Sequence, residues 1–190
     1  AGSNRAEYET IAPRLTKLGF NCLAIDQRSG GNMWGHKNET ATHVGGSDDY
    51  LPALNDLEAA LAWAKPRAAG GKVIVWGSSY SASLVFLLAA RHGGEIAAVL
   101  AFSPGEYFTD TRVVHRAAAK VAAPIFVTSA KDRPEIAAAR SILAASPSTR
   151  KTQFVPRLAG VHGSSTLRDD RNPKGASENW FGVEAFLKGV

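Results

Sequence analysis

The chain has 190 residues, of which 45% are hydrophobic and 21% charged, and its formal net charge is +5 at pH 7. This size and apolar content are typical of one globular domain with a sizeable core, and the sequence holds no apolar run of the roughly 18 residues that a membrane span needs. The clusters of basic residues contain acidic neighbours and lack the interleaved aromatic residues of a nucleic-acid interface. We therefore predict that they form a solvated surface and that the protein binds no nucleic acid.

The first part of the chain is predicted to fold as a helix, a strand, a loop and a second helix. Apolar residues recur at helical spacing over 4–18 and again over 50–64. Between these helices, the apolar run 20–25 predicts a buried strand that contains the only cysteine, Cys22, so a disulfide within the chain is excluded. The segment 28–49 is rich in Gly, Asn, Thr and His without a usable period, and we expect a long surface loop over the strand ends.

The rest of the chain alternates between strand-like and helix-like segments, which is the pattern of an α/β fold. Apolar and β-branched runs predict strands over 72–76, 96–102, 124–130 and 152–155. An apolar helix follows the first of these strands, a helix over 134–145 follows the third, and residues 180–187 form part of a closing helix. We therefore predict a single α/β domain over residues 1–190.

The junction after the first of these strands reads Gly77-Ser78-Ser79-Tyr80-Ser81. A G-x-S-x-G turn between a strand and a helix exposes its serine hydroxyl and points the next backbone N–H at a developing oxyanion, which makes Ser79 the candidate nucleophile. Ser81 stands where the second glycine is expected, and because its side chain is small we expect the turn geometry to survive. The alternative stays open that these serines are only small residues of a tight turn and a helix cap.

A serine nucleophile needs a base and a carboxylate that orients the base, and in this type of fold the three follow in the order Ser, Asp or Glu, His. Asp132 comes directly after the strand 124–130, and His162 lies between small residues in the loop after the last strand. We predict His162 as the base and Asp132 as the orienting acid, both at strand ends, where open α/β sheets bind ligands. Taken singly, Asp132 also suits the N-cap of the helix 134–145, and a lone loop histidine is often only exposed.

These features together resemble the α/β-hydrolase superfamily and, among its branches, the dienelactone-hydrolase and prolyl-oligopeptidase types. The resemblance spans nearly the whole chain. The segment 26–31 is similar to the D-x-R-G-x-G loop that many of these enzymes carry after an early strand. The other segments that carry the resemblance are 77–81, 129–134 and 160–164.

The resemblance implies a mostly parallel sheet with helices on both faces and a serine hydrolase that cleaves carboxylic esters through an acyl-enzyme. It implies Ser79 as nucleophile, His162 as base and Asp132 as orienting acid. It also implies the Tyr80 backbone N–H as one oxyanion donor. Two other functions stay open, namely a peptidase and a non-catalytic binding protein on the same fold.

The start of the chain departs from the pattern of these hydrolases. Related enzymes place a strand that ends in His-Gly or a similar pair before a segment like the one at 1–8, and the loop there supplies the second oxyanion N–H. By position, the amide of Ala1 or Gly2 would lie nearest the oxyanion. We expect residues upstream of Ala1 that add a strand between those at 20–25 and 72–76, with an ordinary flexible terminus as the alternative.

Aromatic residues near the predicted site are candidates for contact with substrate. Trp34 lies in the long loop, and Tyr107 and Phe108 follow the strand 96–102. They would line a pocket for the acyl or alcohol part of a substrate. Ordinary packing beneath loops explains the same residues equally well.

No cofactor is predicted, because the sequence lacks a G-x-G-x-x-G or P-loop frame for a nucleotide. His36 and His43 lie in the long loop without the carboxylate pattern of a metal site, and we predict no metal. The expected partner is a small ester or a short peptide. The oligomeric state and the cellular compartment stay open.

Overall fold

The computed structural model describes residues 1–68, 70 and 72–190. The chain forms two compact units, Ala1–Gly71 and Lys72–Val190, each packed mainly within itself. The prediction of one domain over the whole chain stays a prediction. Among the described residues, no helix is long and apolar enough to cross a membrane.

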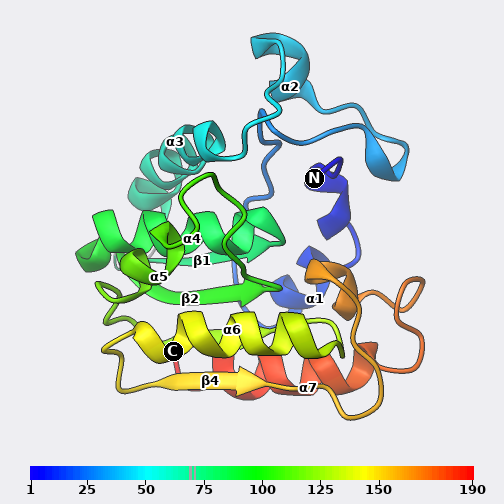
Figure 1. Ribbon diagram of the computed structural model, residues 1–190. Coiled ribbons are helices and arrows are strands. Elements are labelled where there is room, and N and C mark those ends of the chain that lie inside the picture. Colours follow the sequence, from blue (N-terminus) through cyan, green and yellow to red (C-terminus); the bar gives the residue numbers. More distant parts are fainter. Residues whose placement is uncertain (69, 71) are drawn as a thin grey trace. The chain divides into compact units, whose positions relative to one another are not determined.

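Short helices make up most of the first unit (Figure 1). The helix predicted over 4–18 is broken in two, because Pro13 lacks the N–H that would continue the hydrogen bonds and is best accepted in the first turn of a new helix. The helix predicted over 50–64 is present, with a 3₁₀ first turn. The elements are η1 (Arg5–Tyr8), α1 (Ala12–Lys17), η2 (Met33–Gly35), α2 (Glu39–Val44), η3 (Leu51–Ala53), α3 (Leu54–Ala64) and η4 (Lys65–Arg67).

The strand predicted over 20–25 is not formed, since none of these residues is in a strand. Cys22 is exposed rather than buried, and Leu23 is 47% exposed. An apolar run becomes a strand only where a neighbouring strand supplies its backbone hydrogen bonds, and none of the four described strands pairs with residues 20–25. The predictions of a strand here and of a buried Cys22 are therefore wrong.

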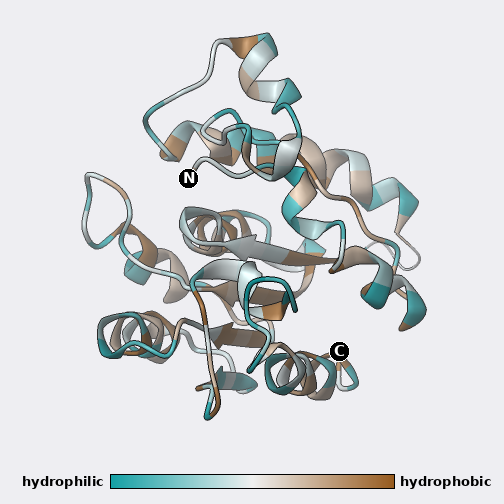
Figure 2. Ribbon diagram, turned by 90° about the vertical axis from the view of Figure 1, so that its right-hand side faces the viewer, coloured by the Kyte–Doolittle hydropathy of each residue, from teal (hydrophilic) through white to brown (hydrophobic). Residues whose placement is uncertain are grey.

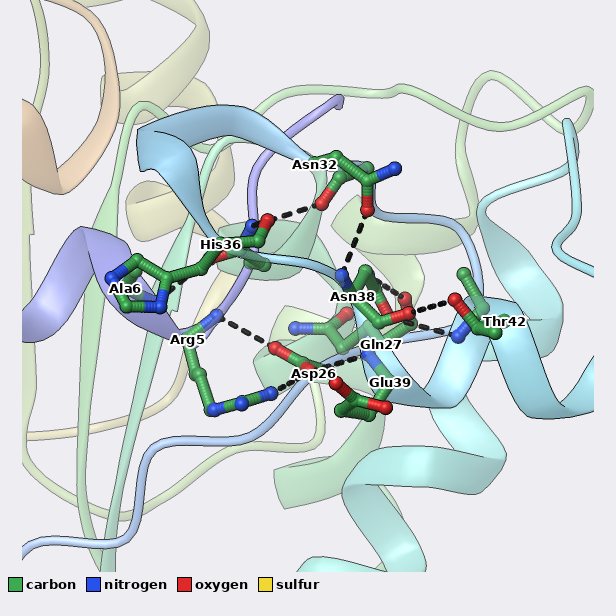
Figure 3. Close-up of polar contacts among 12 residues, drawn as sticks. Arg5, Ala6, Asp26, Gln27, Asn32, His36, Asn38, Glu39 and Thr42 are labelled. Carbon is green, nitrogen blue, oxygen red and sulfur yellow. Dashed lines mark hydrogen bonds and ion pairs between the residues drawn. The ribbon is translucent and has the colours of Figure 1, made fainter.

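The prediction of a long loop over 28–49 is wrong in part, because the segment contains the short helices η2 and α2. Buried polar side chains hold it in place (Figure 3). Asp26 accepts hydrogen bonds from the backbone N–H groups of Arg5 at 2.9 Å and Glu39 at 2.8 Å, and it also pairs with the Arg5 guanidinium. Asn38, which is 1% exposed, caps the start of α2 with its side-chain oxygen. Because most of these partners are backbone groups, the segment follows a fixed path although its sequence has no period.

Four parallel strands form the core of the second unit, side by side in chain order (Figure 1). All four strands predicted for this part are present, as β1 (Val73–Ser78), β2 (Ile96–Phe102), β3 (Ile125–Thr128) and β4 (Lys151–Phe154). Ser78 is level with Phe102, Phe102 with Thr128, and Thr128 with Phe154, so the strands end along one edge. Side chains that directly follow these strands therefore meet at the same end of the sheet.

Helices cover both faces of this sheet, which Figure 2 shows edge-on. α4 (Tyr80–Arg91), α5 (Val113–Ala118) and α6 (Arg133–Ala145) pack in succession on one face, and α7 (Ala176–Leu187) lies on the other, against β4. Two 3₁₀ helices, η6 (Gly93–Glu95) and η7 (Gly163–Leu167), are also present. Phe126 is fully buried, and its ring lies 5.6 Å from that of Phe186 between centroids. The arrangement is the predicted α/β fold with a parallel sheet.

Candidate active site

β1 leads into α4 through a sharp turn that carries Ser79. This residue has φ 60° and ψ −127°, a backbone conformation that residues with a side chain rarely adopt. Its backbone N–H donates to the Phe102 carbonyl at 2.9 Å, which holds the turn against β2. Gly77 has to be glycine, because a Cβ there would lie 2.2 Å from the Ser81 carbonyl oxygen. The turn has the strained strand-to-helix geometry that the sequence predicts, with Ser81 accommodated at the second glycine position.

The loop after β4 brings His162 to this serine. His162 Nε2 lies 2.8 Å from Ser79 Oγ, although 83 positions separate the two residues in the sequence. The two backbone N–H groups that follow the histidine donate to Ser103 Oγ and to Ser78 Oγ, each at 2.9 Å. These acceptors stand at the ends of β2 and β1, so the sheet itself fixes the loop. The predicted contact between the serine and the histidine is present.

The carboxylate on the other side of the imidazole belongs to Glu135, and the prediction of Asp132 at this place is wrong. Glu135 Oε1 lies 2.7 Å from His162 Nδ1. Asp132 is exposed and is the N-cap of α6, where its side chain accepts from the Glu135 backbone N–H at 3.4 Å. The short side chain of Asp132 is thus engaged at the helix start. Glu135, in the first turn of the same helix, is longer by one methylene and reaches back to the histidine.

Glu135 is ionised well below neutral pH. Partial burial raises the pKa of its carboxyl, but hydrogen bonds from His162, Ser103 and the Ala130 backbone N–H outweigh this effect and lower the pKa from 4.5 to about 2. The Ala130 bond is 3.0 Å long and uses the second carboxylate oxygen. The negative charge favours the imidazole tautomer with its proton on Nδ1, which leaves Nε2 as an acceptor for the Ser79 hydroxyl.

Tyr107, from the segment after β2, lies beside the serine. Its hydroxyl donates to the Ser103 carbonyl at 2.9 Å and is also hydrogen-bonded to Ser79. Burial and the negative charge of Glu135 raise the pKa of Tyr107 to about 12, against the opposing effect of the bond to Ser79, so the side chain is a neutral phenol near pH 7. Phe108 is only 7% exposed, which favours the packing alternative for that residue.

The residues predicted as oxyanion donors come from different parts of the chain. Tyr80 is the first residue of α4, so its backbone N–H lies at the positive end of that helix, directly after Ser79. Ala1 and Gly2 belong to the first unit, and so does Trp34. Their predicted roles as donors and as a substrate contact stay predictions.

The groups that this site brings together are a hydroxyl, an imidazole and a carboxylate. They can pass a proton from Ser79 to His162 while Glu135 compensates the charge of the imidazolium. Among residues 1–68, 70 and 72–190, no group of three or more His, Cys, Asp or Glu side chains is placed to hold a metal ion.

Two residues of this site, Glu135 and Ser103, are not among those predicted from the sequence. The signal for Glu135 is the segment 132–135, since an N-cap residue followed three positions later by a glutamate is the pattern of a capping box. Once Asp132 is assigned to the cap, Glu135 is the carboxylate left near the strand end. Ser103 directly follows β2, but a serine after a strand matches no motif that would single it out.

A family model and a solved structure match the chain. The model of the hydrolase family described as serine aminopeptidase, S33, matches residues 1–158, which include Ser79 and Glu135 and end before His162. The solved structure is that of a novel cold-adapted esterase from an Arctic intertidal metagenomic library, with zinc bound. It shares 17% sequence identity and a TM-score of 0.58 over 80% of this chain and 68% of that chain. No curated protein matches the sequence. The chain has an α/β-hydrolase fold and belongs to the serine aminopeptidase S33 family.

Proposed function

We propose that the protein is a serine hydrolase that cleaves carboxylic esters through an acyl-enzyme intermediate. The observation that carries this proposal is the continuous line of hydrogen bonds from Ser79 Oγ to His162 Nε2, at 2.8 Å, and from His162 Nδ1 to Glu135 Oε1, at 2.7 Å. A hydroxyl, an imidazole and a carboxylate in this order are the groups that activate a serine for attack on a carbonyl. Membership of a hydrolase family supports the same function.

In the first half of the reaction, Ser79 attacks the ester carbonyl. The bond from Oγ to the carbonyl carbon forms as the Oγ proton moves to His162 Nε2, and the carbonyl electron pair becomes the oxyanion. Glu135 stabilises the imidazolium, and the Tyr80 backbone N–H donates to the oxyanion. When the intermediate collapses, the bond to the leaving alcohol breaks and that alcohol takes the proton from His162.

In the second half, water replaces the alcohol. His162 takes a proton from the water as its oxygen attacks the acyl carbon. The bond to Ser79 Oγ then breaks, and the proton on His162 returns to Ser79. The products are an alcohol and a carboxylic acid, and water is the only co-reactant.

Tyr107 is the substrate-contacting residue that the geometry supports best. Its phenol stays neutral near pH 7 and donates its one proton to the Ser103 carbonyl, so it presents an aromatic ring beside the reacting group. We therefore place the acyl or alcohol part of the substrate against this ring.

A peptidase with the same chemistry is the second candidate. The family description, which names an aminopeptidase, favours it, whereas the structural neighbour is an esterase. The two reactions share an acyl-enzyme and differ in whether an amine or an alcohol leaves. The predicted likeness to the dienelactone-hydrolase and prolyl-oligopeptidase branches leaves both open.

Labelling with a fluorophosphonate tests the serine chemistry, because this probe modifies only an activated serine. We expect the folded protein to be labelled on Ser79, as located by peptide mass spectrometry. Ser79→Ala should abolish labelling, and the matched control Ser81→Ala, two positions away in the same turn, should retain it. A folded protein that takes no label would contradict the proposal and support a non-catalytic binding protein.

A comparison of leaving groups separates the esterase from the peptidase. Short p-nitrophenyl esters release the coloured alcohol p-nitrophenol. Aminoacyl or dipeptidyl p-nitroanilides release the coloured amine p-nitroaniline. We expect kcat/KM for the esters to exceed that for the anilides by more than the difference in their intrinsic reactivity. Turnover of the anilides alone would assign the protein as a peptidase.

A further inference from the structure

Ser103 is a buried serine with an unusual backbone at the end of β2. It is 1% exposed and has φ 60°, the same positive φ as Ser79 after the neighbouring strand. Its backbone N–H donates to the Thr128 carbonyl at 2.7 Å, so the residue is held in line with the sheet in spite of this conformation. A non-glycine residue in this region is strained, and such strain persists mostly where the surrounding structure has a use for it.

The Ser103 hydroxyl contacts both Glu135 and the residue that follows His162. It accepts the backbone N–H of Gly163, the residue after the histidine, at 2.9 Å. It donates its own proton to the carboxylate of Glu135. The same hydroxyl therefore contacts both the acid and the loop that carries His162, while the Ser103 carbonyl accepts the Tyr107 hydroxyl at 2.9 Å.

We propose that Ser103 is a positioning residue that fixes the orientation of the Glu135 carboxylate relative to the His162 imidazole. This inference rests on the proposed function and adds a fourth residue to the line formed by Ser79, His162 and Glu135. The side chain of Glu135 is 23% exposed and can rotate about several single bonds. A hydrogen bond from the buried Ser103 hydroxyl therefore restricts the orientation of its carboxylate.

Loss of the hydroxyl would leave two groups without their partner at once. The buried N–H of Gly163 would lose its acceptor, and Glu135 would lose a donor. Both the carboxylate and the histidine loop would then gain freedom, and the fraction of molecules with the imidazole aligned toward Ser79 would fall. The effect should reach kcat and leave KM nearly unchanged, because Ser103 does not contact the substrate in the proposed mechanism.

The test uses two substitutions and one matched control on the full chain. Ser103→Ala removes only the hydroxyl oxygen, and Ser103→Gly removes the side chain but accepts φ 60° without strain, so the second variant folds even if the first does not. The control is Ser146→Ala. Ser146 is also a buried serine, 3% exposed, whose hydroxyl donates to the Val121 carbonyl and accepts the Ser148 N–H, away from Glu135.

We expect both Ser103 variants to lower kcat for p-nitrophenyl butyrate and the rate of fluorophosphonate labelling by about tenfold to a hundredfold. Ser146→Ala should keep the wild-type rates. Thermal melting verifies that each variant is folded. Amide hydrogen exchange provides a readout besides activity, since the Gly163 N–H should exchange faster in the Ser103 variants and not in the control.

A double-mutant cycle separates positioning from a merely structural role. If Ser103 acts through Glu135, adding Ser103→Ala to Glu135→Gln should lower the labelling rate by less than about threefold. If Ser103→Ala lowers the labelling rate equally in the wild-type and Glu135→Gln backgrounds, the positioning role of Ser103 is overturned. The same holds if the Ser103 variants behave like Ser146→Ala. Neither outcome affects the proposed function. Wild-type protein that is neither labelled nor active on esters would overturn the proposed function and this inference with it.

Discussion

Glu135 and His162 lie 2.7 Å apart although Glu135 stands in the first turn of a helix and His162 in a loop 27 positions later. The acid of the site is thus carried by a helix that is fixed at its start by its own N-cap, Asp132. Side chains on helices and strands are positioned more precisely than side chains in loops, which favours a constant distance between the Glu135 carboxylate and the His162 imidazole.

Exchange of the acid for its amide tests the assignment of Glu135. Glu135→Gln keeps the size of the side chain but removes the charge that stabilises the imidazolium, so we expect kcat for p-nitrophenyl esters to fall by about 10² to 10⁴-fold. Steady-state kinetics at pH 7.5 measures it. KM should change little, because the carboxylate contacts no substrate in the proposed mechanism.

The matched control for this exchange is Asp132→Asn, three positions earlier. Asparagine is as good an N-cap as aspartate, so activity should stay within about twofold of wild type, while Asp132→Ala should cost about 1 kcal/mol of stability. An inactive Asp132→Asn beside an active Glu135→Gln would return the role of acid to Asp132.

The lowered pKa of Glu135 makes the stability of the fold depend on acid pH. Because the pKa is about 2 in the folded state against an ordinary 4.5, the stabilisation is fully present above about pH 4.5 and is lost as the pH falls through the folded value. As the pH is lowered from about 4.5 to about 2, we expect the free energy of unfolding, measured in urea, to fall more steeply for wild type than for Glu135→Gln. Parallel curves for the two proteins would show that the pKa is not lowered.

Gly77 is the residue of the turn that should tolerate a side chain least. In Gly77→Ala the new Cβ would meet the Ser81 carbonyl oxygen at 2.2 Å, and since backbone cannot yield as a flexible side chain does, we expect a loss of more than about 3 kcal/mol or failure to fold. Gly94→Ala is the control, because nothing lies within 4 Å of a Cβ there. The thermal midpoint measures both, and similar midpoints would mean that the turn is looser than described.

Ser81 should be replaceable, in contrast to Ser79. Ser81→Gly restores the glycine of the G-x-S-x-G frame, and we expect ester hydrolysis within about threefold of wild type at a stability cost of about 0.5–1 kcal/mol, because glycine weakens the start of α4. A loss of activity as large as that of Ser79→Ala would show that Ser79 has been misassigned as the nucleophile.

Most of the second unit could be predicted from the sequence, because β1, β2 and β3 are apolar or β-branched runs that end at a turn. The same reasoning failed at 20–25. Strand formation at Cys22 depends on a hydrogen-bonding neighbour, and hydrophobicity gives no information on whether one is present. The break in the helix predicted over 4–18 could have been placed at Pro13, where a proline has no N–H to offer.

The site could be predicted in part. Ser79 and His162 follow from motif and chain order, and their hydroxyl and ring nitrogen do meet at 2.8 Å. The choice between Asp132 and Glu135 depends on side-chain reach and on which carboxylate the helix start engages, and two acidic residues three positions apart fit the same chain order. Ser103 depends on contacts between segments far apart in the sequence, which no local pattern records.

Ser79 and Ser103 directly follow adjacent strands, and both have a positive φ of 60°. Such a conformation costs on the order of 1–3 kcal/mol for any residue but glycine. A laboratory selection for heat resistance would therefore favour glycine at Ser79 and discard a hydroxyl of the site in doing so, whereas glycine at Ser103 would also leave the buried Gly163 N–H without its acceptor. Engineers who want a more durable version of this protein should hold these two serines constant and look for stability at exposed apolar residues such as Leu158 and Phe181, which are 68% and 73% exposed.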